Sequence, residues 1–91
     1  MAVQVRIPTI LRRYTAEARV VEGKGDTLAE LFHDLDSRFV GIRGDLVTSV
    51  GDLHRFVNIY VNDEDVRFLG GLGSPIADGD TVTILPAVAG G

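Results

Sequence analysis

The chain opens with a strand pattern in which polar side chains separate apolar ones. The apolar residues occupy every second position, a period of two that is typical of a half-buried β-strand: Val3, Val5 and Ile7. Pro8 ends this strand, because a proline nitrogen has no hydrogen to donate within a sheet. A turn or loop over residues 9–15 and a second apolar run over residues 16–21 then predict an opening hairpin.

The clearest pattern is that of an amphipathic helix beginning near residue 27. Thr27 and Glu30 have the spacing of a capping box, in which two side chains satisfy free amides at a helix start. The apolar residues that follow recur at steps of three and four and share one face: Leu28, Leu31, Phe32, Leu35 and Phe39. Gly41 stands where this stripe ends, so we expect the helix to stop there.

The second half of the chain predicts three short strands. From Leu53 onward, one face carries Phe56, Asn58 and Tyr60. Residues 62–65 predict a turn, residues 66–68 a short returning strand and residues 81–85 a final strand. Residues 41–52 have no sustained period and are interpreted as a loop. One helix against a mixed sheet of about four or five strands defines a two-layer α+β fold.

Composition excludes several classes of function. The 91 residues suffice for one domain, and 9 Lys and Arg against 13 Asp and Glu give a net charge of −4. Nucleic-acid binding requires a basic patch, so this balance argues against it. The absence of cysteine excludes disulfides, thiolate metal sites and a cysteine nucleophile. No apolar run approaches the roughly 20 residues of a membrane span, and no secretory signal begins the chain, so we expect a cytoplasmic protein.

The remaining polar motifs favour structural roles over chemistry. His33 and His54 lack the spacing of a metal-binding pair, and no serine, histidine and acid arrangement suggests a catalytic nucleophile. The acidic residues 63–65 lack the distal glutamate of a calcium loop, so a solvated turn explains them better. The glycines at 70, 71 and 73 do not match a dinucleotide-binding motif. We therefore expect no enzyme activity and no bound metal or cofactor.

The C-terminal residues 86–91 form a different kind of motif. Two terminal glycines occur by chance in roughly 0.5% of chains at average glycine usage. A frayed and functionless end is the alternative. Pro86 is expected to end the last strand, which would divide the chain into a globular domain over residues 1–85 and a flexible tail over residues 86–91. Such a tail can extend about 20 Å, and its side-chain-free end is suited to entering another protein's active site.

Together with this small sheet and helix, the tail resembles the ubiquitin-like, β-grasp sulfur carriers of the ThiS and MoaD type. The resemblance is strongest to the actinobacterial carriers of cysteine biosynthesis. It covers nearly the whole chain and rests on residues 7–12, residues 53–68 and residues 76–91. The terminal Gly-Gly is shared across the superfamily. The long central stretch and the ending from Pro86 to Gly91 are what resemble the cysteine branch.

The resemblance implies that Gly91 is the site of chemistry. An ATP-using adenylating enzyme of the ubiquitin-activating type would activate its carboxylate, and a sulfur donor would convert it to a thiocarboxylate. A cysteine synthase dependent on pyridoxal phosphate (PLP) would then use that sulfur with O-phosphoserine, and a metallopeptidase would release the cysteine. ATP, PLP and metal would therefore belong to the partner enzymes. The tail that enters their active sites would consist of Pro86, Ala87, Val88, Ala89 and Gly90.

Docking on these enzymes would require an exposed apolar surface. We expect Phe56, Tyr60 and Leu85 to form it, on the sheet face away from the helix.

Three alternatives to sulfur carriage for cysteine synthesis remain open. The sulfur could serve molybdopterin or thiamine thiazole synthesis, the chain could be a modifier joined to lysines through Gly91, or it could be an interaction domain whose tail has no role.

Overall fold

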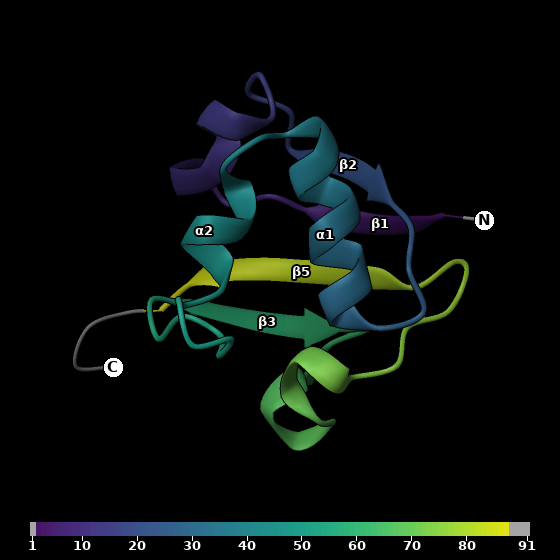
Figure 1. Ribbon diagram of the computed structural model, residues 1–91. Helices are drawn as coiled ribbons and strands as arrows, with labels where there is room; N and C mark the ends of the chain where they lie inside the picture. Colours follow the sequence, from purple (N-terminus) through teal and green to yellow (C-terminus); the bar gives the residue numbers. More distant parts are fainter. Residues whose placement is uncertain (1, 88–91) are drawn as a thin grey trace.

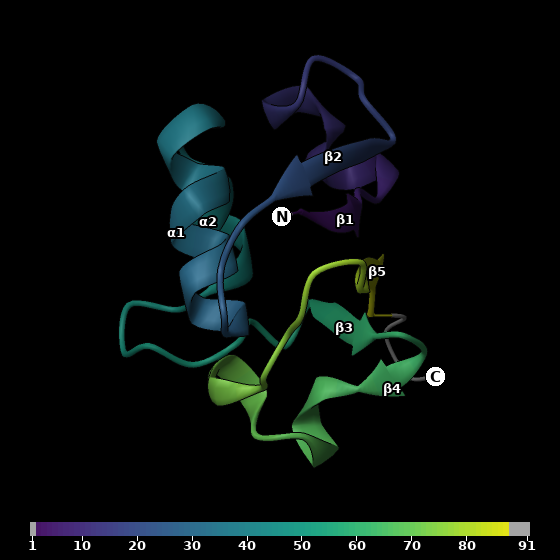
Figure 2. The same cartoon turned by 90° about the vertical axis from the view of Figure 1, so that its right-hand side faces the viewer.

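The computed structural model describes residues 2–87, which form a five-stranded sheet with its helices on one face (Figures 1 and 2). The strands are β1 (Val3–Arg6), β2 (Val20–Gly23), β3 (Val57–Val61), β4 (Glu64–Asp65) and β5 (Thr81–Pro86). Their order across the sheet is β2-β1-β5-β3-β4. The central pair, β1 and β5, is parallel, and the other pairs are antiparallel. The expected α+β, ubiquitin-like β-grasp fold is confirmed.

The main helix, α1 (Leu28–Arg38), begins as the capping pattern predicts. The Thr27 hydroxyl accepts a hydrogen bond from the Glu30 N–H at 3.3 Å. The Glu30 carboxylate accepts from the N–H of Asp26 at 3.0 Å, one residue earlier than in the usual capping box. The two bonds satisfy amides at and just before the start of the helix and fix the point where the chain enters α1.

The core lies between α1 and the inner face of the sheet. The predicted helical stripe is fully buried at Leu28, Leu31, Phe32 and Leu35. The sheet contributes the inward-facing residues at alternate positions of β1, β3 and β5: Val3, Val5, Val57, Ile59, Val61, Val82 and Ile84. Each buried side chain of this size contributes roughly 1.5–3 kcal/mol. This core holds β3 and β5, which carry the candidate site, in one fixed sheet.

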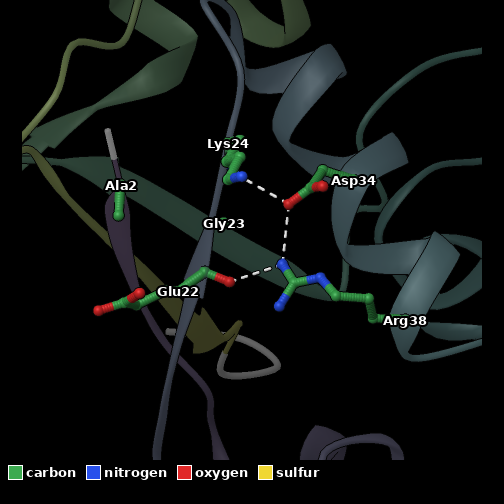
Figure 3. Close-up of a pocket in the computed structure, with 6 residues that line it drawn as sticks. All are labelled: Ala2, Glu22, Gly23, Lys24, Asp34 and Arg38. Atoms are coloured by element: carbon green, nitrogen blue, oxygen red, sulfur yellow. Dashed lines mark hydrogen bonds and ion pairs between the residues drawn. The ribbon is translucent and has the colours of Figure 1, made fainter.

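A polar bridge joins the edge strand β2 to α1 (Figure 3). The Arg38 guanidinium donates to the carbonyl oxygen of Glu22 at 2.6 Å and to the Asp34 carboxylate at 2.8 Å. The same Asp34 oxygen accepts the backbone N–H of Lys24 at 2.9 Å. The outward-facing carbonyl of Glu22 on this edge strand therefore has a partner within the chain.

Two of the expectations for the start of the chain are wrong. Residues 9–15 contain a 3-10 helix, η1 (Thr9–Tyr14), instead of an irregular turn. The second strand begins at Val20 and not at residue 16, because Ala16 and Glu17 have positive φ angles of 53° and 69°. That left-handed conformation cannot continue a strand.

The second half contains two further differences. Residues 41–52, expected to form a loop, include the short helix α2 (Ile42–Leu46), whose two ends are fully buried. The expected strand over residues 66–68 is a 3-10 helix, η2 (Val66–Phe68), since the Asp65 carboxylate accepts the Arg67 N–H at 2.9 Å and caps it. The returning strand is the shorter β4, and a further 3-10 helix, η3 (Gly71–Gly73), follows.

Candidate functional site

The C-terminal end of β5 is where the described chain approaches the expected tail. Pro86 stands opposite Val57 in the ladder, and the N–H of Ala87 donates to the carbonyl oxygen of Phe56 at 2.8 Å. The N–H of Asn62 bonds to the carbonyl of Thr81 at 2.9 Å at the other end of the same ladder. Sheet pairing thus continues two residues past Leu85, where we expected the globular domain to end.

Proline is tolerated in this ladder because of the phase of its hydrogen bonds. Antiparallel partners alternate between bonded and non-bonded pairs. Phe56 and Ala87 are a bonded pair, so the adjacent pair of Val57 and Pro86 is non-bonded. On the opposite side, β1 already ends at Arg6, whose partner is Thr83. The missing N–H of Pro86 therefore leaves no strand partner unsatisfied.

The expected tail falls largely outside the described residues. Val88, Ala89, Gly90 and Gly91 lie beyond Ala87 and are not among the residues that the structure describes. The expected roles of these residues, and of the tail as a separate unit, stay predictions.

The expected docking residues lie in two neighbouring places. Tyr60 and Leu85 are on the outer face of the sheet, because they alternate with the buried Ile59 and Ile84. They are diagonal neighbours, since Leu85 pairs with Asn58, two residues before Tyr60. Leu85 is 45% exposed, and Tyr60 is half-buried.

Phe56 precedes β3 and lies at the end of the sheet, beside the start of the expected tail. Its side chain is 66% exposed, and its ring stacks on that of His54 with centroids 5.6 Å apart. The strand pattern predicted Phe56 on the same face as Tyr60, because that pattern extends back to residue 53. β3 instead begins at Val57, after a turn at residues 55 and 56. Phe56 lies next to Ala87, whose N–H its carbonyl oxygen accepts.

The acidic segment after β3 forms a hairpin turn. Asn62 and Asp63 both have positive φ angles, 49° and 72°, as a two-residue type I′ turn requires. The Asn62 side chain also bonds to the Asp80 carboxylate and accepts the N–H of Thr81. Asp65 hydrogen-bonds to the side chain and backbone of Arg67, and these bonds lower the pKa of the Asp65 carboxyl. Turn geometry and pairing explain these side chains without a bound cation.

Among residues 2–87, no group of three or more histidine, aspartate or glutamate side chains is arranged to hold a metal ion. Within the same range, no helix has the length and apolar character needed to cross a bilayer. His33 lies on the exposed face of α1.

The fold is that of small ubiquitin-like proteins, and comparisons with known proteins agree. The ThiS family model matches residues 5–91. The chain is 60% identical to the sulfur carrier protein CysO of Mycobacterium tuberculosis over the full length of both chains. It is 32% identical to small archaeal modifier protein 3 of Haloferax volcanii, across 71% of this chain and 70% of that protein.

Solved structures give the same relationship. The crystal structure of M. tuberculosis CysO superposes with a TM-score of 0.91 at 59% identity, covering 94% of this chain and 99% of that one. CysO in its crystal complex with BexX from Amycolatopsis orientalis gives 0.92 at 59% identity, covering 99% and 100%. The chain therefore belongs to the ThiS family of small sulfur carriers, which are carriers and not enzymes.

Proposed function

We propose that this chain carries sulfur for cysteine formation, held as a thiocarboxylate on Gly91. The observation that carries the proposal is the 60% identity over the full length to the CysO sulfur carrier. The geometry supports it, since sheet pairing continues to Ala87 and four residues then lead to Gly91. Fully extended, four residues span at most about 14 Å, enough to enter a neighbouring active site.

The first step is activation of the terminal carboxylate. An adenylating enzyme of the ubiquitin-activating type joins a Gly91 oxygen to the α-phosphorus of ATP, and pyrophosphate leaves. Sulfide then attacks the carbonyl carbon and displaces AMP, which leaves the thiocarboxylate. A sulfurtransferase persulfide can deliver the same sulfur if a thiol afterwards cleaves the S–S bond. The chain contains no cysteine, so no internal thiol can capture the activated acyl group.

The second step transfers the sulfur. Thioacids ionise readily, so the sulfur is anionic and nucleophilic at neutral pH. On a PLP-dependent synthase it forms a bond to the side-chain carbon of O-phosphoserine, and phosphate leaves. The cysteine amine then takes over the acyl group from sulfur, which gives an amide on Gly91. Hydrolysis of that amide by a metallopeptidase releases cysteine and restores the carboxylate.

Intact-mass spectrometry tests this proposal directly. The chain is expressed with the adenylating and sulfurtransferase proteins of its own organism. We expect a mass corresponding to replacement of one oxygen by sulfur, and a cysteinyl adduct after addition of the synthase and O-phosphoserine. A variant that lacks Gly90 and Gly91 is the control and should show neither change. Thiocarboxylate that is consumed only by a molybdopterin or thiazole enzyme would overturn the assignment to cysteine.

A modifier function is the second candidate, because the chain resembles a small archaeal modifier protein. In that case Gly91 would form isopeptide bonds with lysines of other proteins. Peptide mass spectrometry of a cell extract would then find lysines carrying a C-terminal remnant of this chain. Conjugates that disappear when Gly91 is deleted would favour this candidate over sulfur transfer.

A further inference from the structure

Charged residues lie at both ends of the sheet. Parallel β1 and β5 begin, and antiparallel β3 ends, at one end (Figure 1). The segments at that end carry Lys24 and several acidic residues: Asp26, Asp63, Glu64, Asp78 and Asp80. At the opposite end, where β5 finishes, η1, α2 and the turn before β3 carry arginines: Arg12, Arg13, Arg43 and Arg55. Asp45 of α2 and Asp52 accompany them, so charges of both signs are present where β5 finishes.

An apolar groove of about 320 Å³ opens at this arginine-bearing end. Ile10 and Leu11 of η1 form one wall, and His54 and Phe56 form the other. Ile10 is 50% exposed and Phe56 is 66% exposed. Such exposure of two large apolar side chains beside each other favours a binding surface over an isolated surface residue.

One arginine side chain borders the groove. Arg13 lies at the rim and contacts Asp45, which also lines the groove, at 2.9 Å, and the Arg13 side chain is 66% exposed. An ion pair that exposed contributes little and leaves the guanidinium able to bind a partner.

The groove also lies beside the last described residue of the chain. The Ala87 N–H bonds to the carbonyl of Phe56, which places Ala87 directly beside the groove wall. A protein that takes Gly91 into its active site must therefore approach within about 14 Å of Phe56. The surface around the groove is then covered in the same encounter.

We propose that this groove, termed the tail-root groove (Ile10, Leu11, His54 and Phe56), receives an apolar side chain of the protein that activates the tail. The activating protein presents a carboxylate beside that side chain, which faces Arg13. A second copy of this chain fits less well in a symmetric contact, because the Arg13 side chains of the two grooves would meet. The inference rests on the proposed function and specifies the chemistry of its first partner.

Two variants and one matched control test the groove with the full-length chain and its adenylating enzyme. Phe56→Ser removes the apolar wall, and Arg13→Ala removes the positive charge at the rim. Lys24→Ala removes the same charge at the other end of the sheet, at an exposed position. The dissociation constant and the rate of thiocarboxylate formation are measured for each variant, with thermal unfolding as the check on folding.

We expect Phe56→Ser to weaken binding roughly tenfold or more. Arg13→Ala should weaken binding about threefold or more in 0.05 M salt, and the difference should shrink towards 1 M salt, where screening acts within about 3 Å. Lys24→Ala should bind as the unaltered chain does. Unaltered chain that acquires sulfur, with both groove variants binding equally well, overturns the groove but leaves the carrier function. Unaltered chain that never acquires sulfur overturns both.

Discussion

Gly23 of β2 lies directly against Leu31 of α1. A Cβ on this glycine would overlap Cδ1 of Leu31, which is fully buried, so this side chain would have to shift. The closest approach between the edge strand and the main helix is therefore set by the absence of a side chain at residue 23. This contact, and not a turn conformation, explains the glycine.

Gly23→Ala should therefore destabilise the fold. Overpacking of a well-packed core costs typically 1–3 kcal/mol, and we expect a loss of unfolding free energy in that range, measured by urea denaturation. Gly44→Ala in α2 is the matched control, because no atom lies within 4 Å of the added methyl group. That variant should be as stable as the unaltered chain, or slightly more stable, because alanine favours helix. Equal stability of the two variants would contradict the packing argument.

The bridge between β2 and α1 gives a second prediction, at Asp34. Asp34→Ala removes the acceptor for both the Lys24 N–H and Arg38, and we expect a loss of about 1 kcal/mol. Asp34→Asn retains an oxygen that can accept the Lys24 N–H and loses only the exposed ion pair. It should cost less, because such pairs contribute little. If asparagine is as damaging as alanine in urea denaturation, the ion pair and not the backbone bond holds the bridge.

The Asp65 carboxyl should make the free energy of unfolding depend on pH in acid. Its hydrogen bonds to Arg67 lower the pKa of this carboxyl in the folded chain. The stabilisation is therefore complete above the unfolded value of about 3.9 and is lost as the pH falls through the lower folded value. We expect Asp65→Asn to be less stable than the unaltered chain at pH 6 and to approach it as the pH falls below about 3.9.

A double-mutant cycle with Arg67→Gln isolates this pair. If Arg67 is the cause, Asp65→Asn should produce no pH-dependent loss in the Arg67→Gln background. Denaturation curves collected from pH 6 downward measure the free energy of unfolding for all four proteins. A difference that persists unchanged into acid would show that Asp65 acts by capping η2 and not through its charge.

The sequence predicted α1 well because two independent local signals agree there. The capping residues and the apolar stripe both depend on neighbours three and four positions apart, so the printed order of residues contains them. α2 offered no such signal, since five residues supply only Ile42 and Leu46 as an apolar pair and include Gly44. A helix this short forms through tertiary packing, which a local pattern does not record.

The sequence indicates a reactive C-terminus, but it does not predict the surface that lies beside it. The terminal glycines and the resemblance point to Gly91, whereas the tail-root groove joins Ile10 to Phe56 from distant parts of the sequence. It forms because η1 follows β1 and the turn before β3 lies at the same end of the sheet, a relation set by strand order. The structure also begins β3 at Val57, where the strand pattern extended back to residue 53.

The outer face of the sheet gives the last prediction. Tyr60→Asp places a charge beside Leu85 on the surface that we expect the adenylating enzyme to contact, and adenylation at low carrier concentration should fall roughly tenfold. Gln4→Asp is the control, since it adds the same charge at an exposed position of β1 on the same face. Thermal unfolding verifies that both variants fold, and pyrophosphate release measures adenylation. Unchanged adenylation of Tyr60→Asp would reject the outer face of the sheet as a docking surface. If Phe56→Ser loses adenylation at the same time, the enzyme contacts the end of the sheet, because only the groove would then be covered.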